Sequence, residues 1–171
     1  MKGFTLLEIL VTVLIFGFII VGMYGVLNIT QANYSTNSAS LNLQQQARQG
    51  MSWLSREIRQ ASWDSIDIVP TPPDLDANNN NSITFNTPGA VGVEYFVTWT
   101  LVSGRELWQL KREHPTGTYK IIANDIRGLN FLTSSGNIVN IQVQASKTFR
   151  SLGKERTLAF PLTEQVTVRN P

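Results

Sequence analysis

Hydrophobic residues are distributed very unevenly along this chain of 171 residues, and the densest run lies close to the N-terminus. From Ile9 to Leu27 the sequence reads ILVTVLIFGFIIVGMYGVL, which is 19 residues without a charge. A helix rises about 1.5 Å per residue, so this run would be about 28 Å long, close to the thickness of a bilayer's hydrocarbon core. The pattern therefore predicts a membrane-spanning helix.

Beyond Leu27 the sequence becomes polar, but an apolar stripe continues at the three- and four-residue steps of one helical face. The stripe consists of Ile29, Ala32, Thr36, Ala39, Leu43, Ala47, Met51, Leu54, Ile58 and Ala61. Polar side chains fall on other faces, among them Gln45, Gln49, Ser52, Arg56 and Arg59. We therefore expect one helix from about Thr5 to about Ser62, with its first half in lipid and its second half packed on a globular head.

The rest of the chain alternates short hydrophobic runs with turn residues, which is the pattern of β-strands. Candidate strands cover 82–86, 93–102, 106–113, 118–123, 126–133, 138–145, 156–160 and 164–169. Turn signals such as Ser103-Gly104-Arg105 separate them, and such short connections favour antiparallel pairing. In 138–145 apolar and polar residues alternate, so one face of that strand needs a cover. We predict an α+β fold in which the amphipathic half of the helix covers a largely antiparallel sheet.

One acidic residue stands at the start of the apolar run. Glu8 is followed by no other charged residue until Arg48. A lone charge at the centre of a membrane helix costs about 2.5 to 3.5 kcal/mol, and less near the helix end, unless another group pairs with it. If the chain were cut after Gly3, the new amino group of Phe4 would be a cation at a similar depth, available to Glu8 of a neighbouring chain. The simpler alternative is that Glu8 only flanks the span at the level of the headgroups.

The segment KGFTLLE at residues 2–8, followed by the apolar run, resembles the class III signal of type IV prepilins and type II secretion pseudopilins. This resemblance implies that prepilin peptidase cuts between Gly3 and Phe4, that the Phe4 amine is N-methylated, and that Glu8 guides subunits into a filament. The partners it implies are other minor and major pilins or pseudopilins, prepilin peptidase, the inner-membrane assembly platform, and membrane lipid before assembly. It also implies a pilin-like α+β head.

These inferences divide the chain into a leader peptide at 1–3, a transmembrane or filament-core helix at 4–27, an amphipathic half of the helix at 28–62, and a β-rich head at 63–171. Lys2 and the initiator amine lie on the short side of the span, and no basic residue lies within about 20 residues of its other end. This asymmetry favours an N-in orientation. We expect a single-pass protein of the inner (cytoplasmic) membrane with its head outside, later transferred to a pilus or pseudopilus.

A second resemblance covers residues 47 to about 86. The segment ARQGMSWLSREIRQA at 47–61, followed by an Asn-rich turn and a strand-rich head, is similar to PilW-type minor pilins and J-type minor pseudopilins. It implies a minor subunit that primes filament assembly in a tip complex. The alternative is an adhesin, or a protein that binds DNA or another ligand at the filament tip, which uses the same anchor.

Composition gives little sign of chemistry. Fourteen basic and 12 acidic residues leave a net charge of +2, which argues against a dedicated nucleic-acid surface. The chain has no cysteine and a single histidine, His114, so a metal site built from these residues is excluded. No nucleophile elbow, Walker loop or G-x-G-x-x-G motif occurs. We therefore expect no catalytic residues, no metal, no cofactor and no enzyme activity.

Three other features of the head have a functional and a plainer explanation. The Asn-rich run at 74–81 resembles the start of a calcium loop, but Asn79 stands where such a loop needs glycine and Phe85 where it needs an acid. A surface turn is therefore favoured. A core position is favoured over a ligand surface for the tryptophans, Trp53, Trp63, Trp99 and Trp108. Solvated strand faces are favoured over a DNA patch for the basic residues Arg105, Lys111, Arg112, Lys120 and Arg127.

Overall fold

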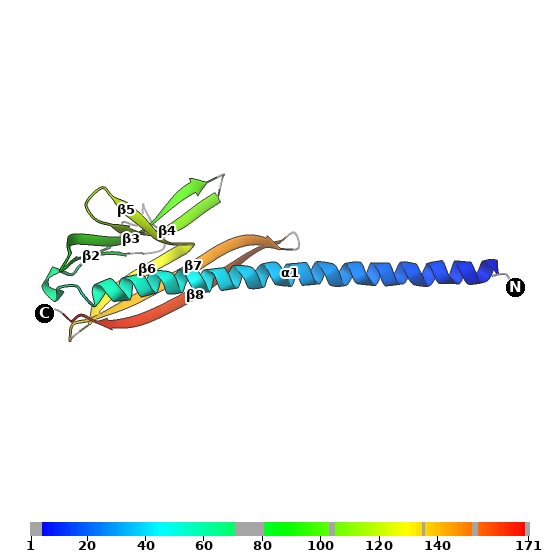
Figure 1. The fold of residues 1–171 in the computed structure, drawn as a ribbon, viewed down its shortest axis with the longest axis horizontal. Helices are drawn as coiled ribbons and strands as arrows, with labels where there is room; N and C mark the ends of the chain where they lie inside the picture. Colours follow the sequence, from blue (N-terminus) through cyan, green and yellow to red (C-terminus); the bar gives the residue numbers. More distant parts are fainter. Residues whose placement is uncertain (1–4, 71–80, 103–104, 135, 152–153, 170–171) are drawn as a thin grey trace.

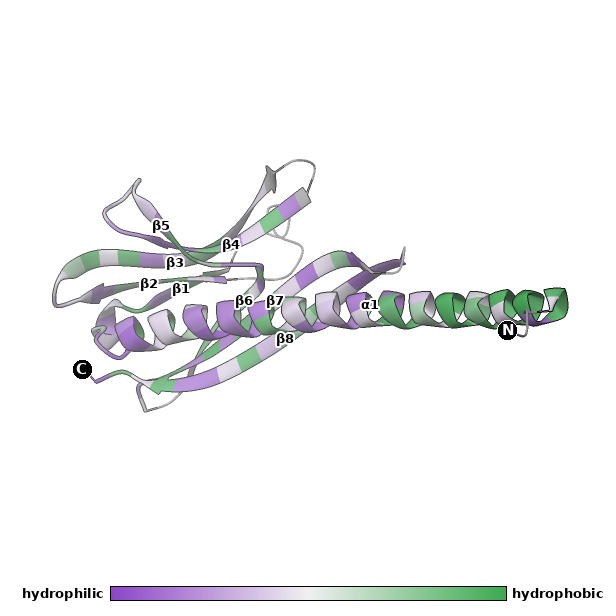
Figure 2. Cartoon of the chain, turned by 45° about the vertical axis from the view of Figure 1, so that its right-hand side comes forward, coloured by the Kyte–Doolittle hydropathy of each residue, from purple (hydrophilic) through white to green (hydrophobic). Residues whose placement is uncertain are grey.

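One long helix carries a β-rich head on its C-terminal half (Figure 1). The computed structural model describes residues 5–70, 81–102, 105–134, 136–151 and 154–169. The helix, α1 (Leu6–Ile58), has 53 residues and is continuous through the polar stretch that follows the apolar run. Colouring by hydropathy shows the change from the apolar to the polar half along this single rod (Figure 2).

The head contains two antiparallel sheets where the sequence predicted one. A short 3-10 turn, η1 (Trp63–Ser65), precedes the strands β1 (Asp67–Pro70), β2 (Asn81–Thr87), β3 (Ala90–Val102), β4 (Arg105–Glu113), β5 (Tyr119–Asn124), β6 (Ile126–Ser134), β7 (Ile138–Ser151) and β8 (Lys154–Thr167). The first five strands form one sheet in chain order, and β6, β7 and β8 form the second. All of the described strand pairs are antiparallel, so the predicted α+β class is confirmed.

Two strand predictions need correction. The segments 156–160 and 164–169 belong to one long strand, β8, which includes Pro161 between them. Proline is tolerated there because β8 is an edge strand of its sheet. The strand β1 was not predicted, since its four residues end at the proline-rich turn that also ends the helical pattern.

The helix ends four residues before the predicted Ser62. After Ile58 the backbone tightens into short-range turn bonds, including Gln60 N–H to the Glu57 carbonyl at 3.0 Å. The Ser62 N–H then donates to the carbonyl of Asn86 at 2.9 Å. This long-range bond holds Ser62 at the end of β2. Its N–H is therefore not available for another turn of the helix.

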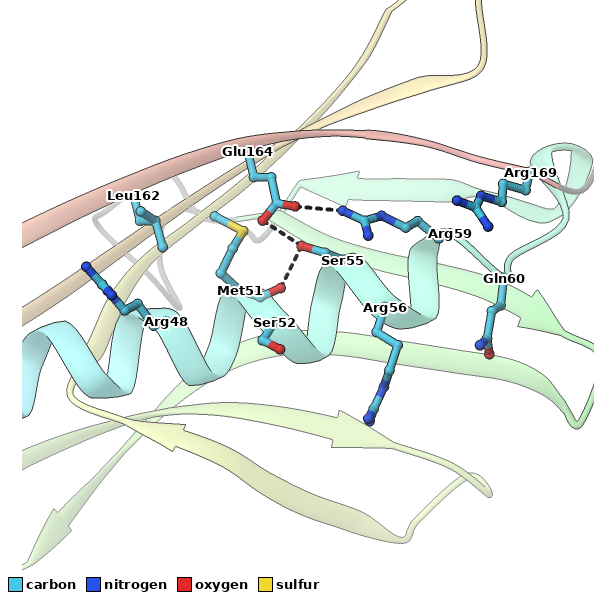
Figure 3. A pocket seen from close by; sticks show the side chains of 10 residues that line it. All are labelled: Arg48, Met51, Ser52, Ser55, Arg56, Arg59, Gln60, Leu162, Glu164 and Arg169. Carbon is cyan, nitrogen blue, oxygen red and sulfur yellow. Dashed lines mark hydrogen bonds and ion pairs between the residues drawn. The ribbon is translucent and has the colours of Figure 1, made fainter.

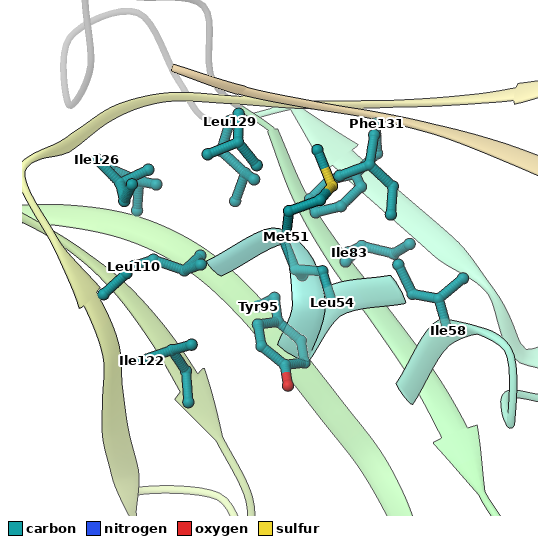
Figure 4. Packing of buried hydrophobic residues seen from close by; sticks show 14 of the residues in the cluster. Met51, Leu54, Ile58, Ile83, Tyr95, Leu110, Ile122, Ile126, Leu129 and Phe131 are labelled. Carbon is teal, nitrogen blue, oxygen red and sulfur yellow. The ribbon is translucent and has the colours of Figure 1, made fainter. Parts of the chain in front are cut away.

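The core lies between the amphipathic half of α1 and the inner faces of both sheets (Figure 4). The apolar stripe is buried from Leu43 onward, at Leu43, Ala47, Met51, Leu54 and Ile58 on α1 and at Ala61 just beyond its end. Its first residue, Ile29, remains 59% exposed because it lies beyond the core of the head. At Gly50 an added Cβ would lie 3.0 Å from Cδ2 of Leu110, so glycine allows the helix to approach β4 closely. The stripe predicted the correct face of the helix.

A half-buried ion pair joins α1 to the five-stranded sheet. The Arg112 guanidinium on β4 donates to the Glu57 carboxylate at 2.9 Å, with side-chain exposures of 19% and 15%. Burial opposes the charge on Arg112, but the hydrogen bond and charge of Glu57 outweigh it and raise the arginine's pKa. Burial and then the Glu57 charge raise the pKa of the nearby Tyr95 phenol. Arg112 is therefore a structural residue, and the prediction of a solvated strand face is wrong for it.

Removing one partner of this pair should destabilise the head more than removing both. Arg112→Met should lower the free energy of unfolding by about 2 kcal/mol, because it leaves the Glu57 carboxylate half-buried without a counter-ion. The double variant Glu57→Leu/Arg112→Met should recover more than half of that loss. Urea denaturation of the detergent-solubilised protein measures both, with the exposed Arg48→Met as a control. A double variant no more stable than Arg112→Met would contradict this explanation.

Candidate functional site

The N-terminal half of α1 is an apolar rod that the rest of the chain leaves uncovered. The large apolar side chains from Leu6 to Leu27 range in exposure from 47% at Val11 to 82% at Leu6. The head contacts only the other half of the helix (Figure 1). Monomeric soluble proteins rarely expose such a large continuous apolar surface, so this one requires lipid or other apolar helices as its surroundings.

The length of the rod fits a bilayer. Among the described residues, α1 is the one helix long and apolar enough to cross a membrane, with a mean hydropathy of 2.7 over its best 18-residue window and no buried residue in that window. In a core helix of a soluble protein, most residues of this window would be buried. The exposure therefore agrees with the expected membrane anchor.

Glu8 lies in the first turn of this helix. Thr5 caps the helix in an extended conformation, and its Oγ1 accepts a hydrogen bond from the Glu8 backbone N–H at 3.3 Å. The Thr12 hydroxyl donates to the Glu8 carbonyl at 2.6 Å. A carboxylate in the first turn also interacts favourably with the positive end of the helix dipole.

The carboxylate of Glu8 is exposed and, in the described part of the chain, forms no ion pair. The nearest other charge on the helix is Arg48, which is 40 positions, or about 60 Å, further along the axis. A counter-charge at the depth of Glu8 must therefore come from the chain's own N-terminus or from another molecule. Gly3 and Phe4 lie outside the described residues, so the expected cleavage site rests on the sequence alone.

A groove between α1 and β8 is the second feature, and the sequence analysis did not predict it (Figure 3). It has a volume of about 520 Å³ and is lined mainly by polar side chains, namely Arg48, Met51, Ser52, Ser55, Arg56, Arg59, Gln60, Leu162, Glu164 and Arg169. Glu164 accepts from the Arg59 guanidinium at 3.0 Å and from the Ser55 hydroxyl at 2.8 Å. Because its acid is already bound, we interpret this groove as a contact between helix and sheet. In the sequence, the spacing of arginine and serine residues along the helix could have indicated this groove.

The other candidates for chemistry in the head are a metal site, the Asn-rich run and His114. Within the described ranges, no three His, Asp or Glu side chains lie close enough to hold a metal ion. The Asn-rich run considered for calcium at 74–81 falls almost entirely on residues 71–80, which lie outside the described residues. His114 is half-buried at the start of the turn between β4 and β5.

The tryptophans mostly follow the core prediction. Trp108 is buried at 9% exposure, and Trp53 and Trp63 pack partly buried against the core. Trp99 is 42% exposed, so the core prediction is wrong for it. Its ring is tilted relative to that of Trp108, and the two ring centroids are 6.4 Å apart.

Three of the basic residues considered for a DNA patch, Lys111, Lys120 and Arg127, contact other residues of the head. Lys111 is buried at 8% exposure and lies over the Tyr119 ring, with its Nζ 4.3 Å from the ring centroid. Lys120 is exposed and lies over Trp53 at 4.6 Å. Arg127 pairs with Glu106 at 3.3 Å. The side chain of Arg105 is not described. Each of these three side chains thus contacts its own neighbour, and together they do not form one open basic surface.

Comparison with protein families adds one finding. Residues 1–24 match the family described as prokaryotic N-terminal methylation motif. Searches of curated proteins and of solved structures gave no match. The matched segment contains Gly3, Phe4, Glu8 and most of the exposed apolar rod. The motif supports a pilin-like protein anchored in a membrane by this helix.

Proposed function

We propose that this chain is a minor pilin or pseudopilin that joins or primes assembly of a type IV pilus or a type II secretion-like filament in a tip complex. The single observation that carries the proposal is an exposed apolar helix that begins with a methylation motif and ends in a folded head. A helix of this kind can be surrounded by lipid or by the equivalent helices of other subunits.

The first step is maturation in the membrane. Prepilin peptidase cuts between Gly3 and Phe4 on the cytoplasmic side and the Phe4 amine is methylated, while the head lies outside the inner membrane. A mono-methylated amine remains basic, so the mature chain begins with a positive charge four residues before Glu8. Each copy then carries both halves of an intermolecular ion pair.

The second step is transfer from lipid to a filament. The apolar rod exchanges lipid contacts for contacts with other subunits, which is possible because its surface from Leu6 to Leu27 is free of the head. Apolar contacts alone do not fix the axial position of one rod against another. A Glu8 carboxylate that meets the Phe4 amine of a neighbour fixes it, because a slipped register leaves both charges unpaired in apolar surroundings.

The maturation step predicts the mass of the purified protein. We expect an intact mass that lacks Met1, Lys2 and Gly3 and is increased by about 14 Da for one methyl group on Phe4. Gly3→Val should block cleavage by placing a branched side chain at the scissile bond, so that the mass retains all three residues. The control is the wild-type chain from cells without the peptidase. Wild-type protein that begins at Met1 in cells with active peptidase would contradict the proposal.

The competing function is an adhesin, or a ligand-binding protein, that uses a pilin-like anchor. Its supporting observation is the exposed Trp99 beside Trp108 on the five-stranded sheet, since an exposed aromatic side chain suits a binding surface. A pull-down from membranes separates the two functions. Small proteins with the same methylation motif in the eluate would support assembly, and a soluble ligand without such proteins would support the adhesin.

A further inference from the structure

The hairpin formed by β7 and β8 extends beyond the rest of its sheet. The last register pair between β6 and β7 is Ile126 with Ala145, whereas β7 and β8 remain paired from Ser146 with Ala159 to Ser151 with Lys154. Of the described strands, only β8 accompanies β7 over this length. We call residues 146–151 and 154–159 the ribbon. In two views it lies along α1 and reaches further toward the helix N-terminus than any other strand (Figures 1 and 2).

The ribbon packs on the helix just beyond the apolar rod. Leu158 on β8 is half-buried against the core, and Phe149 on β7 is half-buried as well. The helix shows a matching half-buried face at Asn28, Ala32, Ser35, Thr36 and Ala39. All residues from Leu6 to Leu27 are exposed, so the covered face begins where the apolar run ends. The end of the ribbon therefore lies beside the boundary of the membrane span.

The ribbon is basic. Residues 146–159 contain the four basic residues Lys147, Arg150, Lys154 and Arg156 and one acid, Glu155. All five side chains are exposed, and Lys147 also reaches Asp125 at 3.0 Å. The helix beside them carries no charge between Glu8 and Arg48. The positive charge of the ribbon is thus not offset by the helix surface on which it lies.

The position of the ribbon coincides with the headgroup layer. If the apolar run ends at the edge of the hydrocarbon core, the polar headgroups occupy about the next 6 Å along the helix. Asn28 to Ala32 span about 6 Å of helix axis, so they lie at this depth. Charges separated by less than about 8 Å interact without strong screening at physiological salt, and Lys and Arg side chains add reach of their own.

We propose that the ribbon binds anionic phospholipid headgroups on the outer face of the membrane before the protein enters a filament. The contact would hold the head against the bilayer and fix the depth of the helix. It rests on the membrane anchor of the proposed function. Lipid is favoured over an acidic protein because the span places headgroups beside the ribbon without requiring a second molecule. The ribbon lies more than 110 residues after the span, too far along the chain to affect the orientation set by basic residues near the span.

The absence of cysteine allows a direct test with the full chain. A fluorophore on Thr157→Cys, an exposed ribbon position, is quenched by a headgroup-labelled lipid in vesicles of phosphatidylcholine, alone or with about one third phosphatidylglycerol. Quenching should be stronger in the anionic vesicles and should fall to the zwitterionic level in high salt. Each basic residue near an anionic surface favours contact about fivefold, so Lys154→Gln/Arg156→Gln should reduce the contact equilibrium about 25-fold.

The matched control is Lys120→Gln/Arg169→Gln, which removes the same charge from exposed positions away from the ribbon and should leave quenching unchanged. Insertion of each variant is measured separately by vesicle flotation, so failure of the anchor is distinguished from failure of the lipid contact. Equal quenching in both kinds of vesicle, for protein that has inserted, would overturn the proposal. If quenching were equal in both kinds of vesicle and the ribbon variant entered filaments poorly, an acidic neighbouring subunit would replace lipid as the partner of the ribbon.

Discussion

Glu8→Val should leave the chain processed and inserted in the membrane but reduce its incorporation into filaments by roughly tenfold or more. The helix boundary should survive, because Thr5 caps through the backbone N–H of residue 8 and not through its side chain. Removing the carboxylate should even favour insertion of the rod into lipid. In the filament, however, the amine of a neighbouring Phe4 would be left in apolar surroundings without its counter-ion, which costs several kcal/mol.

The assay compares the amount of tagged chain in sheared filaments with the amount in the membrane fraction. Glu8→Gln has nearly the same shape as the native residue and should be as defective as Glu8→Val, whereas Glu8→Asp keeps the charge and should retain part of the incorporation. Normal incorporation of the Gln and Val variants would rule out the ion pair as the determinant of register. Loss of all three variants from the membrane fraction would indicate a role in insertion instead.

Leu54→Ala should produce a loss of head stability among the largest that a single truncation in α1 offers. Leu54 is fully buried between the helix and both sheets, at 0% exposure. Truncation of a leucine at such a site costs about 2 to 5 kcal/mol, which includes the cavity left behind. The total stability of a domain is about 5 to 15 kcal/mol, so the melting temperature should fall by roughly 10 °C or more.

The four tryptophans all lie beyond the apolar rod, so their fluorescence in detergent reports the head and not the membrane half of α1. Leu54→Met, which keeps the volume, should cost less than about 1.5 kcal/mol. Ser52→Ala is an exposed change two residues away and should stay within about 0.5 kcal/mol of wild type. A loss for Leu54→Ala no larger than that for Ser52→Ala would show that this half of the helix does not share the core of the head.

The anchor and the face of the helix that enters the core were predictable from the sequence because both depend on short-range periodicity. The run from Ile9 to Leu27 has the length of a bilayer core whatever the head does. The stripe from Leu43 to Ala61 steps at the helical period, and the structure buries it as expected. Likewise, the alternation at 138–145 identified the buried side of β7, with Val139, Ile141 and Val143 all at 1% exposure or less.

The other features depend on long-range pairing, which the periodicity of a single strand does not encode. Nothing local divides the eight strands between two sheets or joins 156–160 to 164–169 across Pro161. The ion pair of Glu57 with Arg112 links residues 55 positions apart, and the contact of Ser55 with Glu164 links residues 109 apart. The ribbon, too, is an arrangement of the tertiary structure. Its basic residues are visible in the sequence, but only the register of β7 with β8 and the packing of both on α1 bring them beside the end of the span.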